Sequence, residues 1–341
     1  MGPLVGVSVV VPVYNSADTL GVLLRRLTAV LVSLGRPYEL ILVNDGSTDS
    51  SWETICDLRM HYHHLRGINL MRNYGQHNAL LCGVQEAVYD VIVTLDDDLQ
   101  NPPEEIPVLL QKLATGYDVV YGIPQREQHG VWRDLASRMT KLALQSAMGA
   151  ETARNVSAFR VFRTQLRDAF ARYQSPFVSI DVLLTWGTTR FTAVPVQHDP
   201  RRVGTSNYTF RKLVTHALSM MTGFSTLPLQ LASLVGFTFT VFGLLVLLYV
   251  LGRYALLGGS VPGFPFLASV IAIFSGAQMF ALGIIGEYLA RMHVRMMERP
   301  VYTVRAHTAS RTDPVELVSE STLTQIHLRE EIRFPFSQQR G

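Results

Sequence analysis

Short apolar runs alternate with amphipathic, helix-length segments from the start of the chain to about Phe191. Candidate strands lie at residues 7–13, 39–43, 67–69, 91–95 and 119–121. Candidate helices lie between them, at residues 19–34, 51–61, 76–87 and 103–114. Apolar strands that alternate with helices are typical of a mainly parallel sheet with helices on its faces. The pattern therefore predicts an α/β domain.

The rest of the chain contains two long apolar segments. No Asp, Glu, Lys or Arg occurs at residues 213–252 or at residues 254–286. Spans at about 229–251 and 264–286 fit within these segments, and each is long enough to cross a bilayer. A core helix of a soluble domain is the alternative, which the length of the runs and the charges at their ends disfavour. Because the connection between the spans is short, we expect a hairpin whose two ends lie on the same side of a membrane.

Basic residues flank this hairpin unevenly. Arg291, Arg295 and Arg299 follow the second span, whereas the connecting loop contains Arg253 alone. The excess of basic residues at the ends of the hairpin predicts that both ends lie in the cytosol. The N-terminus enters the first strand without a basic region or a small-residue cleavage site, which argues against a signal peptide. We therefore expect the α/β domain and both termini to be cytosolic.

These patterns divide the chain into four parts. The α/β domain is expected to cover residues 1–208, an amphipathic helix residues 209–226, the two membrane spans residues 227–290, and a cytosolic tail residues 291–341. Apolar residues recur at helical spacing in the second part, opposite a basic and polar face, which is typical of a helix lying in the membrane interface. Packing of this helix against the α/β domain explains the same pattern equally well.

Composition argues against a nucleic-acid partner, a disulfide framework and a zinc site. The chain has 30 Lys and Arg residues against 27 Asp and Glu residues, a formal net charge of +3. So small a net charge does not favour a nucleic-acid partner, and any recognition by basic residues is expected to be local. The two cysteines, Cys56 and Cys82, lack the spacing of metal ligands, so neither a disulfide framework nor a zinc site is indicated.

Three consecutive aspartates, Asp96, Asp97 and Asp98, end the strand predicted at residues 91–95. Because side chains alternate along a strand, Asp96 and Asp98 are expected to point to the same side. Two carboxylates at one strand tip can hold Mg²⁺ or Mn²⁺ that also binds a diphosphate. An acidic, solvated turn is the structural alternative, since Asp-x-Asp is a short motif.

Two other predicted strands also end in polar residues. The first is followed by Tyr14 and Asn15, and the second by Asp45, Ser47 and Asp49. The carboxyl ends of parallel strands line the ligand crevice of an α/β sheet, so these loops and the three aspartates should converge there. An Asp45 carboxylate can accept a hydrogen bond from a base, and the Tyr14 ring can stack on one. Capping of the following helices is the ordinary alternative for Asn15, Ser47 and Asp49.

Three stretches of sequence are distinctive together. They read Arg-Asn-Tyr-Gly-Gln-His at residues 72–77, Leu-Asp-Asp-Asp-Leu-Gln-Asn-Pro-Pro-Glu-Glu at residues 95–105 and Gly-Ile-Ile-Gly-Glu-Tyr at residues 283–288. Through these stretches the chain resembles the inverting family 2 glycosyltransferases, and within that family the polyprenyl-phosphate glycosyltransferases. The resemblance extends from residue 7 to about residue 304. The first two stretches look closest to the formamido-arabinose branch. The resemblance implies a GT-A catalytic domain, Rossmann-like with a mainly parallel sheet, followed by a two-helix transmembrane hairpin.

The resemblance also implies a donor site for a nucleotide-sugar. The residues expected to bind the nucleotide-sugar are Pro12, Tyr14, Asn15, Asp45, Asp96, Asp97, Gln100 and Arg201. Asp96, Asp98 and Gln100 are expected to surround a Mg²⁺ or Mn²⁺ ion and the diphosphate. Arg201 matches an arginine that grips the diphosphate, and the planar fork of an arginine suits that geometry.

An acceptor site is implied in the same way. Arg133 and Ser137, one helical turn apart, match the pair that holds the phosphate of the acceptor lipid, and Arg126 is expected to add a second positive contact. Asp98, Arg133, Ser137 and Arg201 form the expected catalytic set. Asp181 lies near the place where other family 2 enzymes keep a base, but the local pattern differs, so we expect a surface carboxylate there.

A polyprenyl-phosphate acceptor makes a catalytic base unnecessary. The lipid phosphate is already anionic at neutral pH, so it can attack the anomeric carbon directly while the bound metal and Arg201 stabilise the leaving nucleoside diphosphate. One displacement inverts the anomeric centre. The product would be a polyprenyl-phospho-sugar, made at the cytosolic face of the plasma membrane for cell-envelope glycan or lipid modification. Related hairpin-anchored enzymes make a homo-oligomer the expectation.

Alternatives remain for the donor and for the class of protein. Ser16, Asn44 and Asn207 differ from residues that the family often has, which leaves the base and the sugar of the donor open. Resemblance to the bacterial branches favours a UDP-sugar, and GDP-mannose is the alternative. A processive polysaccharide synthase would be expected to have more membrane spans and a Gln-x-x-Arg-Trp motif, neither of which occurs. A non-catalytic membrane subunit that binds nucleotide or lipid phosphate is the alternative of another class. The set Asp96, Asp98 and Gln100 argues against it.

Overall fold

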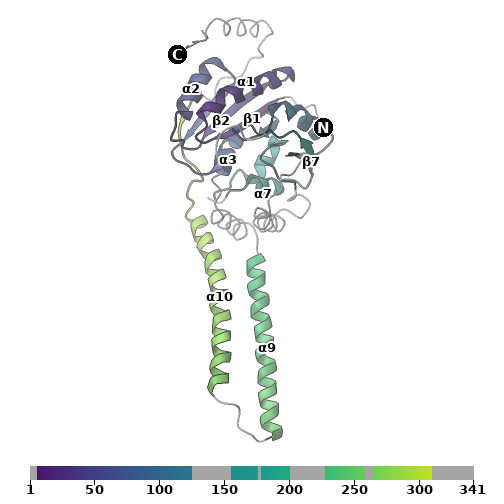
Figure 1. Ribbon diagram of the computed structural model, residues 1–341, viewed down its shortest axis with the longest axis vertical. Coiled ribbons are helices and arrows are strands. Elements are labelled where there is room, and N and C mark those ends of the chain that lie inside the picture. Colours follow the sequence, from purple (N-terminus) through teal and green to yellow (C-terminus); the bar gives the residue numbers. More distant parts are fainter. Residues whose placement is uncertain (1–5, 125–154, 176–177, 200–226, 258–263, 309–341) are drawn as a thin grey trace, which may run out of the picture.

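The structure, a computed structural model, describes residues 6–124, 155–175, 178–199, 227–257 and 264–308. Helices and strands alternate through the first part of the chain and form a rounded α/β body, from which two long helices project together (Figure 1). The α/β class and the mainly parallel sheet expected from the sequence are both confirmed.

Every strand and helix predicted before residue 124 is present. They are β1 (Val7–Val13), α1 (Ala17–Ser33), β2 (Tyr38–Asn44), α2 (Ser51–His61), β3 (Leu65–Leu70), α3 (Gln76–Glu86), β4 (Val91–Thr94), the 3₁₀ helix η1 (Pro103–Glu105), α4 (Ile106–Ala114) and β5 (Val119–Pro124). The later elements are β6 (Arg160–Arg163), the 3₁₀ helix η2 (Thr164–Phe170), α7 (Ile180–Thr185), β7 (Phe191–Val196), α9 (Leu227–Leu257), α10 (Phe264–Met296) and β8 (Val304–His307).

The strands form one eight-stranded sheet in the order β7-β5-β6-β4-β1-β2-β3-β8. Strands β4, β1, β2 and β3 pair in parallel, as do β5 and β7. β6 is antiparallel to both of its neighbours, and β8 is antiparallel to β3 at the edge. The parallel strands β1, β2, β4 and β3 therefore have their carboxyl ends along one edge of the sheet.

Helices cover both faces of the sheet, which explains why the central strands are apolar almost throughout. One core cluster packs α1, α2 and α4 against alternate strand residues such as Val9 and Leu42. The other packs α3 and α7 against the residues between them, such as Val10 and Ile41. All seven residues of β1 and all seven of β2 are buried, so these two strands are fixed firmly at the centre.

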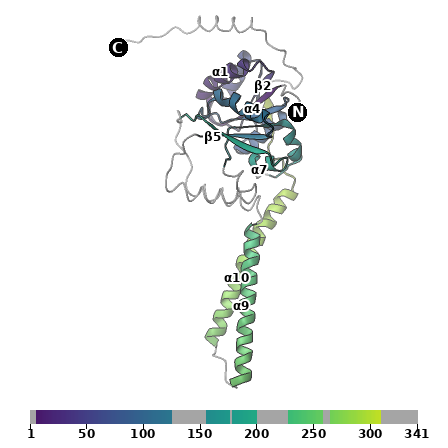
Figure 2. The ribbon, with the colours of Figure 1, turned by 90° about the vertical axis from the view of Figure 1, so that its right-hand side faces the viewer.

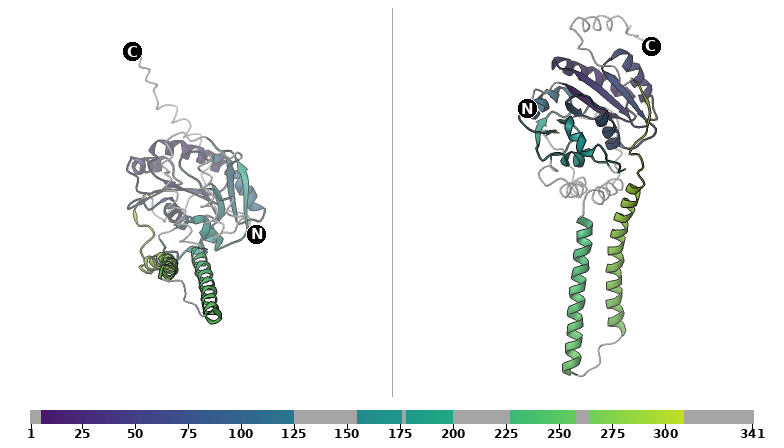
Figure 3. Two further views of the ribbon diagram at one scale, coloured as in Figure 1. Left: turned by 60° about the horizontal axis from the view of Figure 1, so that its bottom comes forward. Right: turned by 180° about the vertical axis from the view of Figure 1, so that it is seen from behind.

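Strands β6, β7 and β8 are absent from the sequence-based prediction. β6 and β8 have four residues each, and both contain charged or polar side chains among the apolar ones, as in Val-Arg-Ala-His at β8. β8 lies in the part of the chain expected to be a tail, yet it returns to the α/β body after the long helices and pairs with β3 (Figure 3). Such pairing depends on a contact between residues far apart in the sequence, which a local pattern does not encode.

The two long helices lie side by side and leave the same end of the α/β body (Figure 2). The Phe239 and Phe274 rings meet edge to face, with 5.8 Å between centroids. Spans at Pro228–Tyr249 and Ile273–Met296 have mean hydropathies of 2.4 and 1.3, and 6% and 0% of their apolar windows are buried. A soluble core helix would be buried, so these exposed apolar surfaces favour a membrane environment.

The expectation that Asp181 is a surface carboxylate is wrong. Asp181 is 4% exposed, forms an ion pair with the buried guanidinium of Arg160, and accepts a hydrogen bond of 3.1 Å from the Tyr121 hydroxyl. Burial and the Asp181 charge raise the pKa of Tyr121 well above its usual range, so this hydroxyl stays a donor. The three side chains join β5, β6 and α7 inside the core. Local sequence does not reveal this burial, because Arg160 and Tyr121 come from other elements.

Breaking this buried pair should destabilise the domain. Asp181→Asn leaves the Arg160 guanidinium buried without a counter-charge, and we expect it to lower the free energy of unfolding by about 3–5 kcal/mol. The double variant Arg160→Met with Asp181→Leu removes the stranded charge and should recover most of that loss. Thermal unfolding of the full chain in detergent measures both. A single variant as stable as the parent would contradict this account.

Candidate donor site at the carboxyl edge of the sheet

Hydrogen bonds join the loops that follow β1, β2 and β4. The Tyr14 N–H donates to Oδ2 of Asp97 at 3.2 Å, which links the first and third of these loops. The Asn15 N–H donates to Oγ of Ser47 at 3.0 Å, and Oδ1 of Asn15 accepts from the Thr48 N–H at 2.8 Å. The structure thus brings together the strand ends that the sequence analysis expected to converge.

Asp45 connects the end of β2 to the turn between β3 and α3. Its carboxylate is 3% exposed and accepts two backbone hydrogen bonds, from the Tyr74 N–H at 2.7 Å and from the Gly75 N–H at 2.8 Å. Burial raises the pKa of Asp45, while these two N–H donors and the nearby Arg72 charge oppose the shift. Asp45 is therefore a structural link within the site, and its contact with a base remains a prediction.

Gly46 brings the same two loops into van der Waals contact. Its φ is +63°, a left-handed conformation that favours glycine. A β-carbon at this position would lie 2.4 Å from the carbonyl carbon of Arg72 and 2.5 Å from the backbone nitrogen of Asn73. Only glycine allows the loop after β2 to lie directly against the turn after β3.

The three aspartates lie in a turn, which corrects one step of the sequence argument. β4 ends at Thr94, so strand alternation does not orient Asp96 and Asp98. Their hydrogen bonds do so instead. Oδ1 of Asp96 accepts from Nε2 of Gln76 at 2.6 Å, and Oδ1 of Asp98 accepts from the Gln100 N–H at 3.1 Å. Leu99, between Asp98 and Gln100, has a φ of +61°, which closes the turn.

Asp97 is partly exposed, as Asp96 and Asp98 are, but it differs from them in its contact with the loop after β1. Burial raises its pKa, although hydrogen bonds from the Ser16 hydroxyl and the Tyr14 N–H lower it in part. Its main contact is the loop after β1, through the Tyr14 N–H. Asp97 therefore links the loops after β1 and β4, and Asp96 and Asp98 are the pair suited to an ion.

Asp96 and Asp98 supply the donor atoms that Mg²⁺ and Mn²⁺ prefer, which are carboxylate oxygens. Among the described residues no three Asp, Glu, His or Cys side chains form a group that could hold a metal by themselves. Mg²⁺ usually keeps several waters and is held by one or two carboxylates together with substrate phosphates. The residues present fit a divalent cation of that kind, one held jointly by the protein and a diphosphate.

Gln100 also anchors the segment that leads to Arg201. Its carbonyl oxygen accepts from the Asp199 N–H at 2.9 Å, and Arg26 pairs with both Glu104 and Asp199. Arg201 lies outside the described residues, as do the predicted acceptor residues and the predicted interface helix at residues 209–226. The predicted acceptor residues are Arg126, Arg133 and Ser137.

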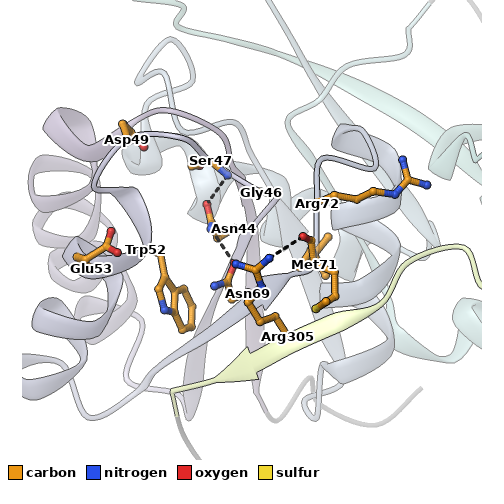
Figure 4. Close-up of a pocket in the computed structure, with 11 residues that line it drawn as sticks. Asn44, Gly46, Ser47, Asp49, Trp52, Glu53, Asn69, Met71, Arg72 and Arg305 are labelled. Atoms are coloured by element: carbon orange, nitrogen blue, oxygen red, sulfur yellow. Dashed lines mark hydrogen bonds between the residues drawn. The ribbon is translucent and has the colours of Figure 1, made fainter.

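A pocket of about 200 Å³ lies beside these loops, between α2 and the ends of β2 and β3 (Figure 4). At its base Nδ2 of Asn44 donates to Oδ1 of Asn69 at 2.9 Å. At its rim a guanidinium N–H of Arg305, from β8, donates to the Met71 carbonyl at 3.0 Å. The sequence alone assigns no role to Asn69, Gln76 or Arg305. For Gln76 the distinctive stretch at residues 72–77 was the available signal, whereas nothing local marks Arg305.

Comparison with known proteins decides the family. Residues 8–173 match the model described as Glycosyl transferase family 2. A Pectobacterium carotovorum subsp. carotovorum (strain PC1) undecaprenyl-phosphate 4-deoxy-4-formamido-L-arabinose transferase is 36% identical over 309 residues, 90% of this chain and 94% of the relative. The chain belongs to glycosyl transferase family 2. The relative of the same description from Salmonella paratyphi A is 38% identical to this glycosyltransferase over 306 residues, 89% of the chain and 94% of the relative. The resemblance noted in the sequence is confirmed.

Solved structures also match this family 2 glycosyltransferase. Glucosyl-3-phosphoglycerate synthase from Mycobacterium tuberculosis, in complex with Mn²⁺, uridine-diphosphate-glucose and phosphoglyceric acid, has a TM-score of 0.48 and 19% sequence identity. The match covers 64% of this chain and 77% of that one.

Substitution of Gly46 tests the close packing of the two loops. Gly46 and Gly35 have nearly equal φ values, +63° and +61°, but a β-carbon at Gly35 meets no atom within 4 Å. Gly35→Ala should therefore lower the free energy of unfolding by about 1–2 kcal/mol, the cost of a left-handed backbone at a residue with a side chain. Gly46→Ala should cost more, because its methyl group also meets the Arg72 backbone. Chemical unfolding of the two variants measures the difference. Equal stabilities would show that the loop and the turn are not in close contact.

Proposed function

We propose that this family 2 glycosyltransferase transfers a sugar from a UDP-sugar to undecaprenyl phosphate, or to a similar polyprenyl phosphate, with inversion at the anomeric carbon. The observation that carries the proposal is the extent of the match to undecaprenyl-phosphate transferases. It covers 90% of this chain and 94% of the relative, so it includes both the α/β body and the apolar helices. The chain therefore shares both its α/β body and its apolar helices with these transferases.

The carboxyl edge of the sheet is the proposed donor site. Parallel strands present their carboxyl ends to ligands, and here the loops after β1, β2 and β4 are joined by hydrogen bonds. Pro12, Tyr14, Asn15 and Asp45 would contact the nucleoside. Tyr14 is 49% exposed, so its ring is accessible for stacking on a base. Asp96, Asp97, Asp98 and Gln100 would surround the diphosphate, which Arg201 would grip from its other side.

A divalent cation, Mg²⁺ or Mn²⁺, is proposed between Asp96 and Asp98. When bound, it neutralises charge on the diphosphate and so makes the nucleoside diphosphate a better leaving group. The chain's own residues position these groups: Gln76 orients the Asp96 carboxylate, and the Gln100 N–H orients that of Asp98. Fixed carboxylates keep the reorganisation cost low when the donor binds.

The acceptor phosphate is proposed to attack without a catalytic base. A phosphate oxygen forms a bond to the anomeric carbon while the bond from that carbon to the diphosphate breaks, and the electron pair leaves with the nucleoside diphosphate. Arg133, Ser137 and Arg126 would hold the acceptor phosphate. Asp181 supports this route, because its carboxylate is buried and paired with Arg160 and so is not available to remove a proton.

The apolar helices are proposed to anchor the enzyme in the cytoplasmic (plasma) membrane. As a hairpin they place both of their ends on one side, and the basic residues in the last turns of α10 and just after it favour the cytosol for that side. The donor site would then face the cytosolic pool of nucleotide-sugars, next to the lipid headgroups. The expected homo-oligomer stays a prediction.

Asp98→Ala tests the proposed donor chemistry. The variant should lose transfer of labelled sugar from a UDP-sugar to undecaprenyl phosphate by about 10²-fold or more, because it removes one of the two carboxylates that hold the cation and diphosphate. Asp57→Ala, which removes an exposed carboxylate on α2, is the matched control and should be active. The assay follows label into a lipid-soluble product. Full transfer by Asp98→Ala would refute the assignment.

Arg133→Ala tests the proposed acceptor site. Loss of its charge should raise KM for undecaprenyl phosphate by about tenfold, with little change in KM for the UDP-sugar, since a charged hydrogen bond to phosphate contributes about 1.5–3 kcal/mol. Steady-state kinetics with each substrate varied in turn separates the two constants. A rise in the donor KM alone would move Arg133 to the donor site.

A further inference from the structure

The segment that follows the membrane helices is bonded to the turn that completes the donor site. This turn, residues 71–75, connects β3 to α3. On one side it carries the Tyr74 and Gly75 N–H groups that hold the Asp45 carboxylate. On the other side it lies against β8 and the residues before it (Figure 4). The turn is therefore held between the loop after β2 and a strand from the far end of the chain.

Two hydrogen bonds attach the turn to β8 and to the residue before it, and both are at Met71. The Met71 N–H donates to the Thr303 carbonyl at 2.9 Å, and the Arg305 guanidinium donates to the Met71 carbonyl at 3.0 Å. The ladder between β3 and β8 is irregular at this point, since its register shifts between Asn69 and Leu70. The Arg305 side chain thus supplies a bond where the regular backbone pairing ends.

The segment itself is firmly docked on the α/β body. Val301 is buried in the core that packs against α3, and the Tyr302 hydroxyl donates to Oε1 of Gln85 at 2.6 Å. The Gly67 N–H donates to Oγ1 of Thr308 at 2.6 Å. Arg305 is therefore carried on a fixed strand, and its bond to Met71 can hold the turn in place.

We propose that Arg305 is a positioning residue for the donor site: it fixes the turn at residues 71–75 and so holds Asp45 in the arrangement that accepts the nucleotide-sugar. The proposal rests on the donor site proposed above and adds a residue from beyond the membrane helices. Arg305 acts through the Met71 carbonyl. Its loss should weaken donor binding and leave the chemical step and acceptor binding unchanged.

Four full-length proteins in detergent test the proposal: the parent, Arg305→Ala, Arg305→Lys and His307→Ala. His307 lies on the same exposed face of β8 but pairs with Ile68, away from the turn, so it is the matched control. Arg305→Ala should raise KM for the UDP-sugar and Kd for UDP by about three- to tenfold, the equivalent of one hydrogen bond. Its kcat and its KM for undecaprenyl phosphate should be unchanged. Arg305→Lys keeps a cationic donor, so its KM for the UDP-sugar and its Kd for UDP should lie between those of the parent and Arg305→Ala. His307→Ala should match the parent in both constants.

Amide hydrogen exchange of the peptide covering residues 71–76 gives a second readout that needs no substrate. Arg305→Ala should exchange faster there than the parent and His307→Ala, while thermal unfolding shows an intact fold. Unchanged exchange would overturn the role of Arg305 in holding the turn even if UDP affinity fell, and unchanged UDP affinity would overturn its effect on donor binding. A parent enzyme that binds no UDP would instead refute the proposed UDP donor, and the exchange comparison would still decide whether Arg305 holds the turn.

Discussion

Two hydrogen bonds to one buried carboxylate hold the carboxyl edge of the sheet in shape. Asp45 accepts both from the turn after β3, and Gly46 lets that turn approach to van der Waals contact. Because β2 and β3 are neighbours in a rigid, buried sheet, fixing their loops against each other fixes the floor on which a nucleotide would lie. The loops after β1 and β4 are added to this frame through Tyr14 and Asp97.

The rest of the molecule is consistent with chemistry between two anions. Asp96 and Asp98 suit a cation shared with a diphosphate, and the carboxylate closest to a role as base, Asp181, is committed to Arg160 in the core. An acceptor that is already ionised needs orientation and charge neutralisation more than proton removal. If the exposed apolar helices cross a membrane, as proposed, they would place such an acceptor, a lipid phosphate, within reach of the same enzyme.

The sequence predicts the alternating strands and helices before residue 124 well, and it predicts the contacts between distant segments poorly. Strands β1 and β2 could be predicted because both of their faces are buried, which leaves unbroken apolar runs. β6 and β8 could not, since four residues with mixed polarity give no periodic signal and their partners lie elsewhere in the chain. Among the described residues, those expected at the donor site could be placed on their loops from the sequence. The bonds that orient them could not, as the buried pairing of Asp181 and the contact of Arg305 with Met71 illustrate.

The most direct test of the central claim is an experimental structure of the full chain with UDP and Mn²⁺ bound. The account predicts that the base lies beside Asp45 and Tyr14, that the ion contacts Asp96 and Asp98, and that the turn at residues 71–75 still bonds to Asp45 on one side and β8 on the other. A nucleotide bound away from the ends of β1, β2 and β4, or an ion with neither carboxylate as ligand, would contradict it.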